Sequence, residues 1–433
     1  MFDLLIVHAD ILTMCDDSPF ISDGCIAVKD GKLAYVGSLS PAEPALRIID
    51  ATGKIALPGL VNAHTHGAMT MMRGYADDCP LQKWLTEKVF PVEARLPPQA
   101  VAASARVGFA EMIRTGTTSI TDMYFHQTAV AQAVLETGLR ASLGNALAGG
   151  GEFSAEDDSR VQDTRRLISE FHHAAGDLLR ADVCVHSEYV STPAIRRFAA
   201  ELAAEHGLRL HLHVSETRSE HEDCIARTGL TPVALLEQEG ILDLPVLAAH
   251  CVWVTEEDME IMRRHGTSAL HCPTSNLKLG SGVARISEMR RRSVNVALGT
   301  DGVCSNNSHD LFDEIRLAAL LQKGQTLDPT ALSAYDAIRM ATAGGAAAQG
   351  REDQIGRLQT GMLADLILVA PQSAGMQPWF RPDSALAYAA HGSDVALTMV
   401  QGRILYENGS FTTIDIDRAI SDLHKYAMPF LVP

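Results

Sequence analysis

Two histidines separated by one residue, His64 and His66, end a short apolar run that begins at Leu57. If this run forms a β-strand, both imidazoles point to the same face, because side chains alternate along a strand. Two imidazoles on one face make half of a metal site. The chain has 17 histidines, and a second pair with this spacing occurs at His211 and His213. Such a short motif also arises by chance, so the prediction depends on companion residues elsewhere.

Three later apolar runs also end in imidazole or carboxylate side chains. These end residues are His213 with Glu216, then His250, then Asp301. Imidazole and carboxylate are the ligand types that suit zinc or iron, and a catalytic zinc keeps one position open for water. A bound zinc can lower the pKa of water from about 15.7 to about 7, which makes it a nucleophile at neutral pH. The pattern therefore predicts a divalent metal and hydrolytic chemistry; zinc is favoured, and iron suits the same ligands.

The order of the elements predicts the fold class. Residues 1–57 contain short β-segments with turn signals such as Asp30-Gly31, and residues 361–433 return to this style. Between them, in residues 58–360, eight strand-like runs alternate with helical patterns. Eight strand–helix units imply parallel strands that close into a barrel. We predict an α/β protein with a metal-dependent (β/α)8 TIM-like barrel at 58–360 and a small β-sandwich domain built from 1–57 and 361–433.

A barrel of this kind carries its active site at the C-terminal ends of its strands. The imidazoles and carboxylates described above all fall at such ends, so the fold would bring them together. Each has an ordinary structural explanation when taken alone, either as a core histidine or as an acid near a helix N-terminus. Their shared position at the strand ends favours a metal site.

The composition limits the classes of partner. With 433 residues and 46% hydrophobic residues the chain can bury a large core, and its net charge is -17. This charge argues against a nucleic-acid partner, which requires a basic patch. The sequence shows no signal peptide and no apolar run long enough for a bilayer. Its eight cysteines, with no C-x-x-C pair, are typical of free thiols. We expect a cytoplasmic protein with a small-molecule substrate and no membrane partner; a homo-oligomer is compatible with this composition.

Several segments of the chain resemble the amidohydrolase superfamily. They are PGLVNAHTH, WLTEKVFPVEARL, HLHVSE, AHCV, CPTSNLKLGSG and GTDG. Within the superfamily the chain is most similar to the mononuclear-metal deaminases of 5'-methylthioadenosine and S-adenosylhomocysteine, over nearly its whole length. The resemblance implies a hydrolase that releases ammonia from a 6-aminopurine nucleoside such as these two, adenosine or 5'-deoxyadenosine.

The resemblance also implies roles for the residues at the strand ends. The metal ligands that it implies are His64, His66, His213 and Asp301. Glu216 would be the proton shuttle, and His250 would orient the water on the metal. From the chemistry of these side chains we expect Asp301 also to accept the proton of that water. His211 is predicted not to be a ligand.

Further residues match substrate contacts of the resembled family. Glu93 matches a glutamate that holds ribose hydroxyls, His186 a histidine that contacts the purine ring, and Trp84 an aromatic residue that lines the pocket. Asn145 stands where users of S-adenosylhomocysteine carry the first of two arginines that bind the amino-acid carboxylate. Arg160 is a candidate for the second. This departure favours a nucleoside with a neutral 5' group.

Two other functions stay open on the sequence alone. The same fold and metal could serve a guanine, pterin or triazine-type heterocycle, and the ribose role of Glu93 would then be absent. The second open function is that of a metal-stabilised binding protein without turnover. Binuclear amidohydrolases often bridge two metals with a modified lysine after the fourth strand, but residues 181–189 contain no lysine. We therefore expect one metal per chain and no ring opening of cyclic amides.

Overall fold

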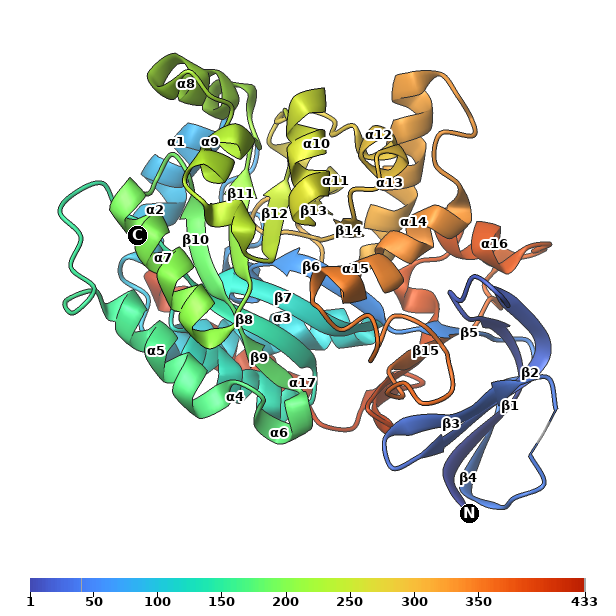
Figure 1. Ribbon diagram of the computed structural model, residues 1–433. Coiled ribbons are helices and arrows are strands. Elements are labelled where there is room, and N and C mark those ends of the chain that lie inside the picture. The colour runs from blue at the N-terminus through green and yellow to red at the C-terminus, as the bar shows by residue number, and fades with distance from the viewer. Residues whose placement is uncertain (40, 432–433) are drawn as a thin grey trace.

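The parallel strands from the middle of the chain form one closed sheet (Figure 1). The computed structural model describes residues 1–39 and 41–431. The strand order is β14-β13-β12-β11-β10-β8-β7-β6, with β9 beside β8, and the neighbours run parallel. A parallel bridge between Thr65 and Asp301 joins the two edges. The strands are β6 (Leu60–Thr65), β7 (Thr117–Tyr124), β8 (Arg140–Leu147), β9 (Leu179–Ala181), β10 (Val183–Ser187), β11 (Leu210–Val214), β12 (Val246–His250), β13 (Ser268–His271) and β14 (Val296–Leu298).

The two edges of this sheet meet at backbone distance. The backbone N–H of Asp301 donates to the carbonyl oxygen of His64 at 3.0 Å. A Cβ at Gly299 would stand 2.7 Å from the same carbonyl oxygen, so only glycine fits there. The closure of the barrel thus places the ends of β6 and β14 side by side, and with them His64 and Asp301.

Helices connect the strands and surround them (Figure 1). Several begin at a side-chain cap and end at a left-handed glycine. Thr192 caps α7 and Thr255 caps α10, and Gly207 and Gly266 end these two helices with φ of 63° and 65°. The helices are α3 (Pro98–Arg114), α4 (Gln127–Thr137), α5 (Ser159–Phe171), α6 (Ala174–Asp177), α7 (Pro193–His206), α8 (Arg218–Thr228), α9 (Pro232–Gln238), α10 (Glu256–His265), α11 (Pro273–Lys278), α12 (Ile286–Arg291), α13 (Leu311–Thr326), α14 (Ala334–Met340) and α15 (Ala343–Ala348). In the described part of the chain no helix is long and apolar enough to cross a membrane.

Both ends of the chain build a second sheet. Its order is β18-β17-β16-β15-β5-β1-β2-β3, and β4 pairs with β1. The strands are β1 (Phe2–Leu12), β2 (Phe20–Lys29), β3 (Lys32–Gly37), β4 (Ala45–Asp50), β5 (Ile55–Pro58), β15 (Leu366–Val369), β16 (Val395–Val400), β17 (Arg403–Glu407) and β18 (Ser410–Phe411). The antiparallel pairing of β5 with β15 joins the strand before the barrel to the strand after it. The predicted fold class, a barrel with a β-domain from both ends, is confirmed.

Two helices near the C-terminus contact the barrel helices. α16 (Pro382–Tyr388) packs against α14, and α17 (Ile416–Tyr426) packs against α3. The segment after residue 360 therefore contributes to both units. We retain 1–57 with 361–433, and 58–360, as our proposed domain boundaries.

A buried ion pair holds the second sheet against the barrel. Arg140, at the start of β8, donates from Nε and Nη2 to Asp365 Oδ2 and Oδ1, at 2.8 and 3.0 Å. Their side chains are 0% and 1% exposed. Asp365 Oδ1 also accepts from the backbone N–H of Gln401 at 2.8 Å. A two-pronged pair of this kind is strong and directional, so it fixes β8 relative to β15.

We expect Asp365→Asn to lower the free energy of unfolding by about 3–5 kcal/mol, because the buried Arg140 guanidinium loses its counter-charge. Calorimetry should show a Tm lower by several degrees. Glu407→Gln is the matched control, since it breaks the more exposed Arg47–Glu407 pair and should cost less than about 1 kcal/mol. Equal losses in the two variants would contradict the structural role of the buried pair.

Candidate metal centre and substrate pocket

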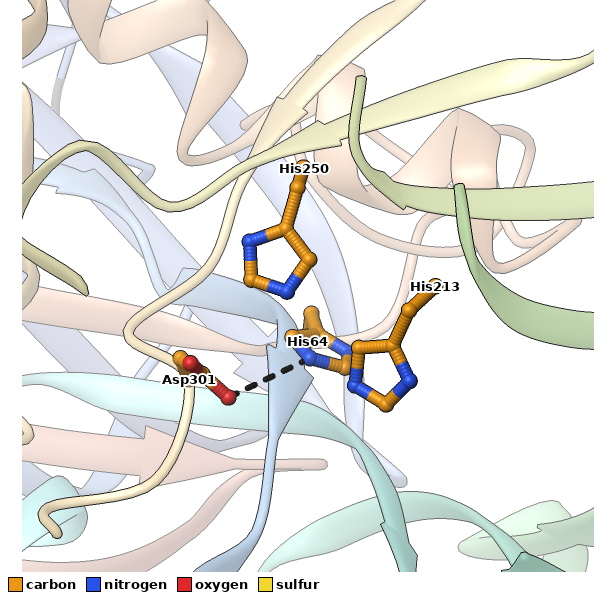
Figure 2. Close-up of side chains that lie close together, drawn as sticks. All are labelled: His64, His213, His250 and Asp301. Carbon is orange, nitrogen blue, oxygen red and sulfur yellow. Dashed lines mark ion pairs between the residues drawn. The ribbon is translucent and has the colours of Figure 1, made fainter. Parts of the chain in front are cut away.

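Four side chains at the ends of barrel strands converge on one point. His64, His213, His250 and Asp301 each offer one ligand atom, and these atoms all lie within 4.8 Å of one another. Figure 2 shows the three rings and the carboxylate directed toward a shared centre. They come from β6, β11, β12 and the residues after β14, and all four are buried. The barrel thus brings together residues that lie far apart in the sequence.

His66 joins the same cluster. Its Nε2 lies 3.1 Å from Asp301 Oδ1 and 3.4 Å from His213 Nε2. His64 Nε2 lies 3.4 Å from the same carboxylate oxygen. The four ligands predicted from the sequence therefore present three Nε2 atoms and one carboxylate oxygen to one small volume, with His250 beside them.

The Nδ1 atoms of the three predicted imidazole ligands are already engaged. His66 Nδ1 donates to the carbonyl oxygen of Met123, and His213 Nδ1 donates to that of His186 at 2.5 Å. His64 Nδ1 lies 2.9 Å from His211 Nε2. Engagement of Nδ1 leaves Nε2 free to bind a cation, and such partners usually fix the ring orientation of metal-binding histidines.

The cluster offers a cation neutral ring nitrogens with free lone pairs and one negatively charged carboxylate. His64 Nε2 is buried without a hydrogen-bond partner among the residues that the structure describes, so a lone pair on this nitrogen would be satisfied by a cation. Burial lowers the pKa of His64 to about 4 and that of His213 well below its usual value, which keeps both rings in the neutral, metal-binding form. Burial opposes a charge on His66, but the Asp301 carboxylate raises its pKa to about 9. The cluster therefore favours one positive charge beside Asp301, which a cation can supply.

Asp301 is held in place from two sides. Its Oδ2 accepts from Ser275 Oγ at 2.6 Å and from Ser305 Oγ at 2.8 Å, which leaves Oδ1 for the cluster. Although burial opposes its ionisation, the imidazoles of His64 and His66 close to Oδ1 hold its pKa well below the usual range. Asp301 and His250 also have φ values of 60° and 71°, a left-handed conformation that costs free energy in non-glycine residues and is common at functional sites.

Glu216 and His250 form the second part of the centre. Glu216 Oε2 lies 3.8 Å from His250 Nε2, and His250 Nδ1 lies 2.8 Å from Asn276 Oδ1. The backbone N–H of Glu216 donates to the carboxylate of Glu220 at 2.7 Å, which fixes the turn before α8. Burial raises the pKa of Glu216. A carboxyl group whose pKa is raised toward neutrality can both give and take a proton.

A cavity borders the cluster. Three residues predicted to contact substrate, Trp84, Glu93 and His186, line it together with the metal-centre residues. Trp84 and Glu93 belong to a covering segment that consists of α1 (Leu81–Lys83), the π-helix η2 (Trp84–Val89) and α2 (Phe90–Glu93). Burial raises the pKa of Glu93 to about 7. The covering segment thus supplies part of the wall of the cavity.

Asn145 and Arg160 line an adjoining outer cavity instead. Both are engaged with neighbouring residues. Asn145 Oδ1 accepts from the backbone N–H of Gln127 at 3.2 Å, and its Nδ2 donates to Thr164 Oγ1 at 3.3 Å. Arg160 forms a two-pronged ion pair with Asp158, at 2.9 and 2.5 Å. The charge of Arg160 is therefore compensated before any ligand enters.

The sequence prediction missed residues that support the ligands. Ser275 and Asn276 lie in the quoted segment CPTSNLKLGSG but received no role, and Ser305 received none either. His211, which is predicted not to be a ligand, contacts the predicted ligand His64. The sequence signal for this contact was the position of His211 two residues before His213, because the two side chains then lie on one face of β11.

The chain matches the model of the amidohydrolase family over residues 55–405. It is 46% identical to a 5-methylthioadenosine/S-adenosylhomocysteine deaminase of Moorella thermoacetica, over 94% of this chain and 95% of that protein. It is 41% identical to a 5'-deoxyadenosine deaminase of Methanosarcina mazei, over 99% of this chain and 98% of that protein. An adenosine deaminase of Xanthomonas campestris, solved with bound zinc, superimposes with a TM-score of 0.93 at 33% identity, over 98% of both chains.

Replacement of a predicted ligand should remove the metal without unfolding the chain. We expect Asp301→Ala to weaken binding of zinc by more than about 100-fold, since even residues that only support ligands contribute 10–100-fold. Elemental analysis after dialysis against a zinc buffer gives the measurement. Asp258→Ala is the control, because Asp258 is a buried carboxylate in the cap of α10, away from the cluster. Metal retained at the wild-type level in Asp301→Ala would refute the ligand assignment.

Proposed function

The chain belongs to the amidohydrolase family, and from this premise we propose that it is a metal-dependent hydrolytic deaminase of 6-aminopurine nucleosides. The observation that carries the proposal is the cluster of imidazoles and Asp301 that lines a cavity, with Glu216 beside it. Relatives named for deamination of 5'-methylthioadenosine, S-adenosylhomocysteine and 5'-deoxyadenosine align with nearly the whole chain, which supports this substrate class.

The proposed ligands are His64, His66, His213 and Asp301. A divalent metal fits this donor set, and we propose zinc, because imidazole with carboxylate suits it and a similar structure was solved with zinc. When bound, such a metal activates water for attack on a ring carbon at neutral pH. The remaining steps are proton transfers and substrate positioning, which fall to the side chains around it.

His250, Asp301 and Glu216 divide the proton transfers. His250 orients the attacking water through Nε2, because its Nδ1 is engaged by Asn276. Asp301 accepts the proton that the water releases. Glu216 donates a proton to the ring nitrogen next to the attacked carbon. It then takes the proton of the newly added hydroxyl and passes it to the amino group, which leaves as ammonia. The proton held by Asp301 restores Glu216 to its starting form. Water is consumed, and the ring carbon exchanges its amino group for oxygen.

We assign the nucleoside to the inner cavity. His186 faces the purine ring, Trp84 forms a wall, and Glu93 accepts hydrogen bonds from the ribose hydroxyls. Glu93 also borders the outer cavity, so a ribose held there would direct its 5' group outward. Of the charged residues that line this outer cavity, Arg160 is paired with Asp158, and Asp163 accepts from Thr128. A neutral 5' group therefore suits this cavity better than an anionic one.

The role of Glu216 can be tested separately from metal binding. Glu216→Gln keeps the size and most of the packing of the side chain but cannot transfer a proton. We expect kcat to fall by about 10²–10⁴-fold, the usual contribution of a general acid–base group, while the metal content stays unchanged. Glu222→Gln, an exposed site on α8, is the control. Turnover near that of the wild type would exclude Glu216 as the proton shuttle.

Ammonia release over a panel of amines tests the substrate class. The panel contains adenosine, 5'-deoxyadenosine, 5'-methylthioadenosine, S-adenosylhomocysteine, adenine, guanine and a pterin. We expect higher kcat/KM for nucleosides with a neutral 5' group than for S-adenosylhomocysteine, because Arg160 in the outer cavity is already paired with Asp158 and would have to leave it to bind the carboxylate. Turnover of free bases alone would leave the metal centre intact but would overturn the nucleoside assignment. Metal binding with no ammonia release would indicate a binding protein.

A further inference from the structure

His211 contacts the metal centre although it lies outside the predicted ligand set. We propose that His211 is a positioning residue: it accepts the Nδ1 hydrogen of His64 and thereby holds His64 in the only tautomer that can bind the metal. This inference rests on the proposed metal site, and it concerns the strength of metal binding rather than the choice of substrate.

The contact between these two rings crosses the interior of the barrel. His64 belongs to β6 and His211 to β11, two strands that are not neighbours in the sheet. His64 Nδ1 lies 2.9 Å from His211 Nε2, and the ring centroids are 4.9 Å apart at an interplanar angle of 82°. Both side chains are completely buried. The edge-on approach directs a nitrogen of each ring at the other, as a hydrogen bond requires.

A neutral imidazole carries one hydrogen, so the pair has two arrangements. In the first, His64 Nδ1–H donates to His211 Nε2, and His64 Nε2 presents a lone pair to the cluster. In the second, His211 Nε2–H donates to His64 Nδ1. The hydrogen of His64 then sits on Nε2, which faces Asp301 Oδ1 at 3.4 Å. Only the first arrangement leaves His64 able to bind a cation.

This ambiguity distinguishes His64 from the other two imidazole ligands. His66 and His213 donate to backbone carbonyl oxygens of Met123 and His186, which can only accept. Their tautomers are therefore set by the backbone. His64 has a partner that can either donate or accept, so its tautomer is set by His211. Binding of the metal at Nε2 and acceptance by His211 at Nδ1 then stabilise each other.

A matched pair of substitutions separates this role from packing. Gln and Met have similar length and shape, but only the Gln side chain offers an oxygen that can accept strongly from His64 Nδ1–H. We expect His211→Met to weaken zinc binding by about 10–100-fold, the usual loss when a partner of a metal-binding histidine is removed. His211→Gln should recover most of the wild-type affinity. Affinity is measured by competition with a chelator, so it needs no substrate.

His271→Met is the control for the loss of a buried ring. His271 is completely buried at the end of β13, and neither ring nitrogen has a hydrogen-bond partner in the described ranges. Its replacement should change zinc affinity by less than a few-fold. Wild-type affinity in His211→Met, or equal losses in the Met and Gln variants, would overturn the proposal. A wild type that binds no zinc would instead overturn the metal site itself.

A second measurement does not depend on the folding of any variant. In the zinc-loaded wild type with ¹⁵N-labelled histidine, the nitrogen chemical shifts report which ring atom carries hydrogen. We expect His64 to carry it on Nδ1 and His211 to carry it on the nitrogen that faces away from His64. A hydrogen on His211 Nε2 in the zinc-loaded protein would contradict the inference.

Discussion

The closure of the barrel between β6 and β14 is the constraint on which the metal centre depends. The backbone hydrogen bond from Asp301 to His64 both closes the sheet and places a carboxylate against two imidazoles. Gly299 permits this approach, because a side chain there would collide with His64. Fold and site therefore share the same few atoms. A change that loosens this seam would move a ligand and open the barrel together.

The hydrogen bonds around the cluster explain how three imidazoles and a carboxylate are tolerated together in a largely buried site. Each predicted imidazole ligand has its Nδ1 engaged, and Asp301 has one oxygen held by Ser275 and Ser305. The atoms left over all face one volume. Burial disfavours charge on both kinds of group. It keeps His64 and His213 neutral, whereas the surrounding imidazoles outweigh it at Asp301 and keep that carboxylate ionised.

The sequence was sufficient for the fold class and for the convergence of the strand-end residues, because strand ends in a parallel barrel meet at one rim whatever the loops do. His64, His213 and Asp301 could be found by this rule. The rule does not reach Ser305 or Asn276, which lie in loops or short helices whose path no periodicity determines. The pairing of Arg160 with Asp158, which decides the charge of the outer cavity, likewise depends on rotamers that the sequence does not encode in any simple pattern.

The pairing of β5 with β15 affects how the chain is made as well as how it is held. β5 is synthesised early, but its antiparallel partner follows about 300 residues later, which at ribosomal rates is roughly 15–60 s. During that time one edge of the N-terminal sheet has unpaired backbone groups, and such edges are sites of misassociation between nascent chains. Arg140 likewise lacks its partner carboxylate over much of the same interval, until Asp365 has been synthesised. Expression yield in a living cell should therefore be sensitive to the speed of translation and to chaperones that shield strand edges.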